Sequence, residues 1–154
     1  MNTTVACPDR AATQALAARV AEILRPGDLV LLEGDLGTGK TTFVQGLARA
    51  LGVDSAVTSP TFVLMNIHPT RAGFDLVHVD VYRLDRLSEV ADLALAEMLE
   101  DGAVVVVEWG DRAAAALPGG HLLVRIEAVG EDRRSVTLEA HGPAWVDRVA
   151  EMAA

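Results

Sequence analysis

Cysteine and lysine are nearly absent from this sequence of 154 residues, since each occurs once, as Cys7 and Lys40. A single cysteine excludes an internal disulfide, and the four histidines lack metal-ligand spacing, which argues against a zinc site. Long apolar runs are missing too, because none approaches the roughly 20 residues that cross a bilayer. Residues 1–20 lack a basic stretch followed by a long apolar one. We therefore expect no secretory signal, no membrane partner and a cytoplasmic location.

Basic residues are scarce relative to acidic ones. The chain has 13 Lys and Arg against 22 Asp and Glu, which gives a net charge of −9. Proteins that bind nucleic acid on their own gain affinity by placing basic side chains on phosphates. Any contact with RNA is therefore expected to be local or made through a partner.

Arginine takes the place of lysine almost throughout the chain. There are 12 arginines, and the one lysine is Lys40. This usage suggests that lysine is kept only where a planar guanidinium cannot serve, for example where a compact ammonium lies between phosphate oxygens.

Hydrophobic periodicity predicts alternating strands and helices along one globular domain, residues 1–154. The apolar runs Leu29–Leu32 and Ala103–Val107 are typical of strands buried on both faces, as in a parallel sheet. The other expected strands are Thr4–Ala6, Phe62–His68, Leu76–Val81, His121–Glu127 and Arg134–Ala140. The expected helices are Arg10–Leu24 capped by Asp9, Lys40–Leu51, Ser88–Leu99 capped by Ser88, and Pro143–Met152.

The segment from Gly34 to Thr41, GDLGTGKT, fits the phosphate-loop pattern G-x-x-x-x-G-K-[ST] at every fixed position. Glycines let the backbone turn its N–H groups towards phosphate oxygens, and Lys40 supplies a point charge to the β- and γ-phosphates. The hydroxyl of Thr41 can bind Mg²⁺, and the helix that follows directs its positive end at the anion. We therefore expect an α/β fold, a single P-loop NTPase-like domain whose mostly parallel central sheet is flanked by helices, with a C-terminal antiparallel strand pair.

Two acidic residues at strand ends are candidates for the second metal ligand that such a loop requires. Glu108 follows the apolar run Val104–Val107 and is the first choice, binding the metal directly or through water. Asp80 follows Val79 and can position the attacking water, act as general base or share the metal. The alternative for Asp80 is an ordinary strand-end carboxylate satisfied by backbone groups.

Other polar and aromatic residues admit both a functional and a structural interpretation. Ser59–Thr61 lies where a switch segment can sense the γ-phosphate, or is an ordinary turn. Trp109 can cover the site or belong to the core. The arginines can contact phosphate, adenine or a partner, or can simply be solvated; they are Arg83, Arg86, Arg133 and Arg134.

Four segments together resemble one family. They are GDLGTGKTT at Gly34–Thr42, TSPTF at Thr58–Phe62, HVDVYRL at His78–Leu84 and EW at Glu108–Trp109. In their order and spacing they look like the TsaE (YjeE) proteins of bacteria. The resemblance implies an accessory ATPase that uses ATP and Mg²⁺ to support the TsaD and TsaB proteins in making threonylcarbamoyladenosine (t6A) in tRNA, which the chain itself would contact only indirectly.

The resemblance also implies roles for individual residues. Those that would hold the nucleotide are Gly37, Thr38, Gly39, Lys40, Thr41 and Thr42, with Trp109 over the site and Arg133 near the base. Thr41 and Glu108 would hold Mg²⁺. Asp80 and Lys40 would take part in catalysis.

Three other functional classes compete with this interpretation. A GTPase needs an Asn/Thr-Lys-x-Asp segment, which cannot exist where Lys40 is the one lysine. A small-molecule kinase has the right loop and length but needs an acceptor pocket and an arginine-bearing lid. A nucleotide-dependent interaction module with slow turnover remains compatible with the family interpretation.

Overall fold

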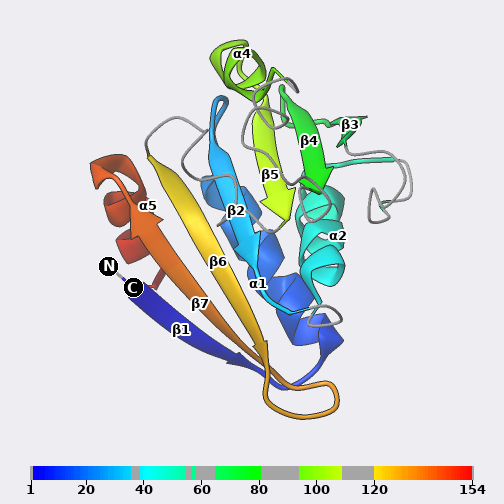
Figure 1. Ribbon diagram of the computed structural model, residues 1–154, viewed down its shortest axis with the longest axis vertical. Helices are drawn as coiled ribbons and strands as arrows, with labels where there is room; N and C mark the ends of the chain where they lie inside the picture. Colours follow the sequence, from blue (N-terminus) through cyan, green and yellow to red (C-terminus); the bar gives the residue numbers. More distant parts are fainter. Residues whose placement is uncertain are drawn as a thin grey trace.

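The computed structural model describes residues 2–35, 39–54, 57, 65–80, 94–108 and 120–153, whose strands form one sheet (Figure 1). The seven strands lie in the order β1-β7-β6-β2-β5-β4-β3. Their bounds are β1 Asn2–Cys7, β2 Leu29–Glu33, β3 Met65–Pro69, β4 Asp75–Asp80, β5 Val104–Glu108, β6 His121–Ala128 and β7 Arg134–His141. The helices are α1 Arg10–Ile23, α2 Lys40–Ala50, α4 Leu95–Glu100 and α5 Pro143–Ala153.

The centre of the sheet is parallel and its outer pairs are antiparallel. β6, β2, β5 and β4 run parallel as neighbours, whereas β7 is antiparallel to β6 and β1, and β3 is antiparallel to β4. The two apolar runs predicted to be buried on both faces form β2 and β5, in the middle. The predicted α/β fold is therefore confirmed, and β6 and β7 are its C-terminal antiparallel pair.

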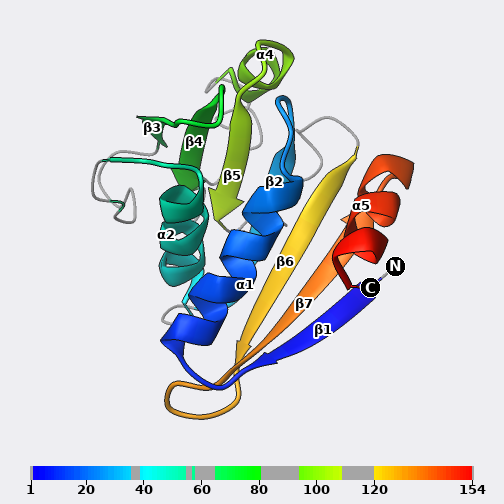
Figure 2. The same cartoon turned by 180° about the vertical axis from the view of Figure 1, so that it is seen from behind.

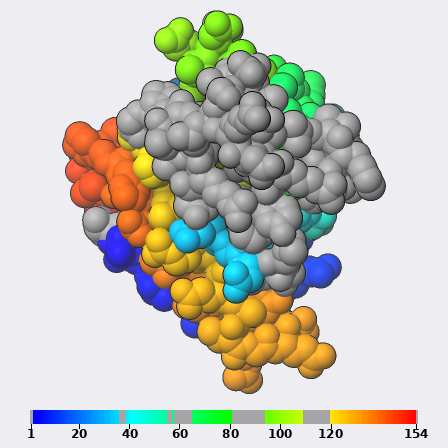
Figure 3. All heavy atoms as spheres, viewed as in Figure 1, coloured from blue at the N-terminus to red at the C-terminus, as the bar shows by residue number. Residues whose placement is uncertain are grey.

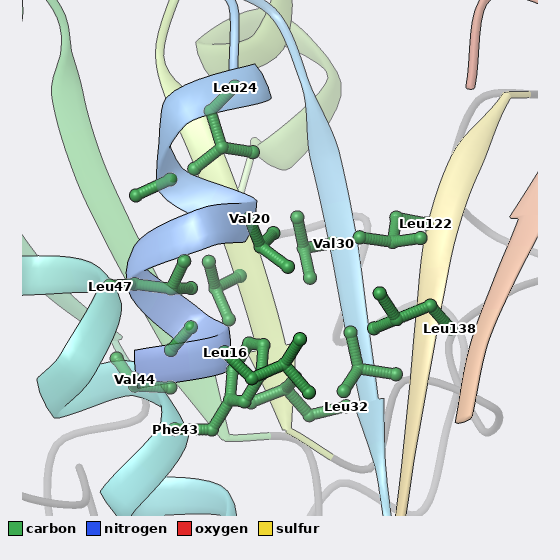
Figure 4. Packing of buried hydrophobic residues seen from close by; sticks show 14 of the residues in the cluster. Leu16, Val20, Leu24, Val30, Leu32, Phe43, Val44, Leu47, Leu122 and Leu138 are labelled. Atoms are coloured by element: carbon green, nitrogen blue, oxygen red, sulfur yellow. The ribbon is translucent and has the colours of Figure 1, made fainter. Parts of the chain in front are cut away.

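Hydrophobic clusters cover both faces of the sheet. The larger one lies under α1, α2 and α5, which Figure 2 shows on the same side. Side chains of α1 and α2 pack there against side chains of β2, β6 and β7. Residues of this cluster labelled in Figure 4 include Leu16, Val20, Phe43, Val44, Leu47, Val30, Leu32, Leu122 and Leu138. The smaller cluster, on the other face, includes Leu95 and Leu99 of α4. Because side chains alternate along a strand, Leu32, Val104 and Val106 project towards the α1–α2 face.

Helices α1 and α2 approach each other closely at Gly46. A Cβ atom on Gly46 would lie 2.8 Å from the carbonyl oxygen of Gln14 and 2.9 Å from the Cβ of Ala17. The absence of a side chain therefore permits the contact that fixes α2, the helix after the phosphate loop, against α1.

Helix ends follow local chemistry, with one correction to the predicted bounds. The predicted cap of α1 is confirmed, because the N–H of Ala12 donates to Oδ1 of Asp9 over 2.8 Å. The predicted continuous helix Ser88–Leu99 is wrong. Ala94 has a left-handed φ of 57°, so α4 starts only at Leu95, and Ser88 lies outside the described residues. None of the helices in the described ranges combines the length and apolar character needed to cross a membrane.

The strand predicted for residues 62–68 is described from Met65 onwards, and it extends to Pro69. The other predicted elements match the observed ones within two residues at the ends that the structure describes.

A buried ion pair fixes α5 to the segment between α1 and β2. The guanidinium of Arg148 donates to both carboxylate oxygens of Asp28, over 2.6 and 2.9 Å, and to the carbonyl of Ile23 over 2.8 Å. The same guanidinium lies 3.8 Å from the ring centroid of Trp145. The C-terminal helix is thus held by charge as well as by apolar packing.

The sheet face opposite α1 is partly open at β1, β6 and β7. In the space-filling view of that side, side chains of these strands lie at the surface (Figure 3). Arg125 of β6 contacts Glu33 over 3.2 Å and Glu139 over 3.4 Å, in a half-exposed cluster.

Candidate active site

The predicted phosphate loop joins the central strand β2 to α2. β2 ends at Glu33 and α2 begins at Lys40, so the loop leaves the carboxyl end of a parallel strand and enters a helix N-terminus. In open α/β sheets this is the edge at which ligands bind, and helix N-termini attract anions. Gly37 and Thr38 lie outside the described residues, so their nucleotide contacts stay predictions.

Gly39 forms the entry to α2. Its φ of 103° is left-handed, a conformation that favours glycine, and no described side chain caps the helix. A glycine at this position has no side chain to cap the helix, and helix N-termini attract anions such as phosphate.

Lys40 turns back over the loop. Its side chain is buried, with 5% of the residue exposed, and Nζ donates to the carbonyl oxygen of Gly34 over 2.6 Å. The ammonium therefore lies against the start of the loop rather than in open solvent. Thr41 and Thr42 follow it in the first turn of α2 and are half-buried. The arrangement brings one cation, two hydroxyls and a helix N-terminus to one place.

The two predicted acids lie side by side. Asp80 ends β4, Glu108 ends β5, and the two are register partners, while Glu108 also pairs with Leu32 of β2. Glu108 is 3% exposed and Asp80 is half-buried. Because Leu32 projects towards the α1–α2 face, both carboxylates belong to the face that α2 covers, at the edge where the phosphate loop begins.

The residues present fit a nucleotide-bound magnesium ion. Mg²⁺ prefers oxygen ligands, keeps several waters and is usually held by one or two protein oxygens together with phosphates. A hydroxyl from Thr41 and a carboxylate from Glu108 match that requirement. The described residues contain no group of three or more histidines, cysteines or acids that could hold a metal ion.

His78 is a site residue that the sequence analysis did not single out. It is fully buried, and its Nε2 lies 2.5 Å from Oε2 of Glu108. The signal in the sequence was the spacing, since residues 78 and 80 of one strand project to the same face. Which residue of the next strand they meet depends on register, which no local pattern gives.

A second histidine, His68 of β3, lies near His78. It is 7% exposed, and burial is the main cause that lowers its pKa. The cause is desolvation, which disfavours the cationic form. His68 therefore favours the neutral state more than a histidine in water does.

A small hollow lies beside the loop on the side away from the carboxylates. It is lined by Gly39 and Thr42, by Arg10 and Thr13 of α1, and by Asp132 and Arg134 of the β6–β7 turn. Of the two neighbouring arginines, Arg134 lines the hollow, whereas Arg133 is exposed on the turn. A base contact by Arg133 stays a prediction.

Several predicted residues lie outside the described part of the chain. They are Ser59, Thr61, Arg83, Arg86 and Trp109. The predicted switch role of Ser59–Thr61, the contacts of the two arginines to phosphate, adenine or a partner, and the place of Trp109 over the site stay predictions.

Comparison with known proteins identifies the family of the chain. Residues 7–136 match the family described as "Threonylcarbamoyl adenosine biosynthesis protein TsaE". The chain is 48% identical to the tRNA threonylcarbamoyladenosine biosynthesis protein TsaE of Streptomyces coelicolor, over 84% of this chain and 91% of that protein. It is 41% identical to the protein of the same name from Bacillus subtilis, over 84% of this chain and 80% of that protein.

A solved structure agrees with the sequence comparisons. The crystal structure of Bacillus subtilis YdiB superposes with a TM-score of 0.82 at 30% identity, covering 99% of this chain and 95% of that one. The fold, the phosphate loop and the paired strand-end acids thus occur in a chain that belongs to the TsaE family.

Proposed function

We propose that this protein is an ATPase of tRNA threonylcarbamoyladenosine biosynthesis, which binds and hydrolyses ATP with Mg²⁺ to support a TsaD–TsaB complex. One observation carries the proposal. The single lysine of the chain, at a helix N-terminus, and two carboxylates in register at neighbouring strand ends lie at the same edge and on the same face of the sheet.

Phosphate binding is assigned to the loop and the first turn of α2. The N–H groups around Gly39 donate to phosphate oxygens, and Lys40 exchanges the Gly34 carbonyl for the β- and γ-phosphates. Both interactions place positive charge where negative charge collects as the terminal phosphoryl group is transferred.

The metal is assigned to Thr41 and Glu108, with phosphate oxygens and water completing its coordination. Magnesium, when bound, neutralises charge on the β- and γ-phosphate oxygens. Asp80, on the strand next to Glu108, is assigned to orient the attacking water and accept its proton.

The assignment of partners rests on the family of the chain and on its net charge. The curated relatives carry the name of a tRNA-modification protein. Because the chain has a net charge of −9, it is a poor tRNA ligand by itself, and its effect is assigned to TsaD-like and TsaB-like proteins that hold the tRNA.

Calorimetric titration with ATP and Mg²⁺ tests the nucleotide assignment. Lys40→Ala should weaken binding by about 10- to 100-fold, since a hydrogen bond to a charged group contributes about 1.5–3 kcal/mol. Arg49→Ala is the matched control, because it removes one positive charge from the exposed far end of the same helix. Equal affinities for Lys40→Ala and Arg49→Ala would overturn the assignment of the loop.

A further inference from the structure

The contact between His78 and Glu108 is a buried polar interaction that includes a proposed metal ligand. His78 is 0% exposed and Glu108 3% exposed, and Nε2 of the histidine lies 2.5 Å from Oε2 of the glutamate. A carboxylate buried without a donor is strongly disfavoured, so this imidazole stabilises Glu108 in its place.

Strand geometry fixes the pair. His78 is the register partner of Val106, and Glu108 is the next residue on the same face of β5, so the two side chains are diagonal neighbours across parallel strands. They belong to the neighbouring parallel strands β4 and β5, not to a loop. The orientation of the imidazole is therefore set by the backbone of two buried strands.

The proton position follows from hydrogen bonding. Nδ1 of His78 is buried and has no hydrogen-bond partner among the described residues. An N–H at that nitrogen would be left unpaired, whereas a bare lone pair costs less to bury. The arrangement therefore fits the tautomer that carries its proton on Nε2 and donates it to Oε2 of Glu108.

One carboxylate oxygen of Glu108, Oε2, is therefore occupied by this hydrogen bond. Within the described part of the chain Oε1 accepts no hydrogen bond. Histidine and carboxylate partners of this kind orient a metal ligand without touching the metal, and their loss typically lowers metal affinity about 10- to 100-fold.

We infer that His78 is a positioning residue that holds the Glu108 carboxylate by Oε2 and leaves Oε1 for the nucleotide-bound divalent cation. The inference rests on the proposed function, because it requires Glu108 to be the metal ligand. A histidine that only filled the core would support stability but not the affinity for the cation.

The test compares substitutions that separate these two roles. His78→Leu keeps apolar bulk and removes the donor, while His78→Gln places an amide N–H near the position of Nε2. His68→Leu is the matched control, since it removes a buried histidine from the neighbouring strand on the same sheet face. Glu108→Gln reports on the metal ligand itself.

Two quantities are measured for each variant. Mn²⁺ affinity of the protein–ADP complex is read from the free-Mn²⁺ signal in electron paramagnetic resonance. ADP affinity in EDTA and the urea midpoint give nucleotide binding without metal and stability. His78→Leu should lower Mn²⁺ affinity by about 10- to 100-fold with little change of ADP affinity in EDTA. His78→Gln and His68→Leu should stay within about threefold of the unsubstituted protein, which is less than 1 kcal/mol.

The outcomes distinguish this inference from the proposed function. If Glu108→Gln weakens Mn²⁺ binding and His78→Leu does not, the positioning role is wrong and the metal assignment stands. If Glu108→Gln leaves Mn²⁺ affinity unchanged, both are wrong. Should His78→Leu fail to fold by circular dichroism, His78→Asn, whose side chain is too short to reach Glu108, replaces it and carries the same expected loss.

Discussion

Arg148→Met should destabilise the protein strongly while leaving its nucleotide site intact. Arg148 joins α5 to Asp28 and to the end of α1, with side chains that are 7% and 10% exposed in the ion pair. Methionine has a similar length and keeps apolar contact with Trp145, but it leaves the Asp28 carboxylate buried without its cation. The helix that carries Arg148 lies beyond residues 7–136, the part that matches the family.

The magnitude follows from the contacts. Breaking a buried ion pair by removing one partner costs about 3–5 kcal/mol, because the remaining charge stays desolvated. The lost bond to the Ile23 carbonyl adds about 1 kcal/mol. A total of about 4–6 kcal/mol would be a large part of the roughly 5–15 kcal/mol that stabilises a domain, and it would lower Tm by about 8–24 °C.

A double substitution separates the charge from the packing. Asp28 also accepts the backbone N–H of Arg25 over 2.6 Å, and asparagine can keep that bond. Arg148→Met with Asp28→Asn should therefore lose only about 1–2 kcal/mol, less than Arg148→Met alone, since no unpaired charge remains.

Urea unfolding followed by circular dichroism measures these differences. Arg125→Met is the control, because its ion pairs with Glu33 and Glu139 are partly exposed and should contribute less than about 1 kcal/mol. A loss below about 1 kcal/mol for Arg148→Met, or a larger loss for the double variant, would show that an unpaired Asp28 charge is not what destabilises the protein.

Three further predictions concern packing, pH and the loop. Gly46→Ala should destabilise the protein by about 1–2 kcal/mol in urea, because the clash with Gln14 and Ala17 outweighs the gain in helix propensity; a more stable variant would contradict the close approach of α1 and α2. His68 has a lowered pKa in the folded state, so its contribution to stability is complete above its ordinary value of 6.5 and is lost as pH falls below it. The free energy of unfolding should therefore fall less between pH 7 and 5 in His68→Leu than in the unsubstituted protein. An equal fall in both proteins would show that His68 does not cause the pH dependence. ATP with Mg²⁺ should slow acetylation of Lys40, the one lysine, by about tenfold at about ten times its Kd, measured by mass spectrometry against a free lysine derivative; undiminished acetylation would place the ammonium away from the phosphates.

Much of the fold could be predicted from local sequence because the central strands are unambiguous. The run Val104–Val107 is apolar on both faces, and the cap of α1 at Asp9 precedes a clear helical period. The pairing of β1 with β7 could not be predicted, since it joins opposite ends of the chain. The start of α4 could not be predicted because alanine gives no indication of the left-handed conformation that Ala94 adopts.

The positions of the candidate site residues could be predicted where a motif fixes their spacing, but not where the register between strands determines which residues meet. The loop pattern identifies Lys40, and strand-end position identifies Asp80 and Glu108. The meeting of His78 with Glu108 depends on how β4 and β5 align, a relation between residues 30 positions apart. Arg134 lines the hollow beside Gly39 because of the shape of the β6–β7 turn, which could not be predicted from the sequence.

The most direct test of the central claim is ATP turnover by the purified protein, alone and with TsaD, TsaB and tRNA, with Lys40→Ala and Arg49→Ala beside it. We expect hydrolysis that rises in the presence of the partners, is lost in Lys40→Ala and is kept in Arg49→Ala. Turnover that is unchanged by the partners and by Lys40→Ala, or that instead depends on a small hydroxylated acceptor, would contradict the proposed function.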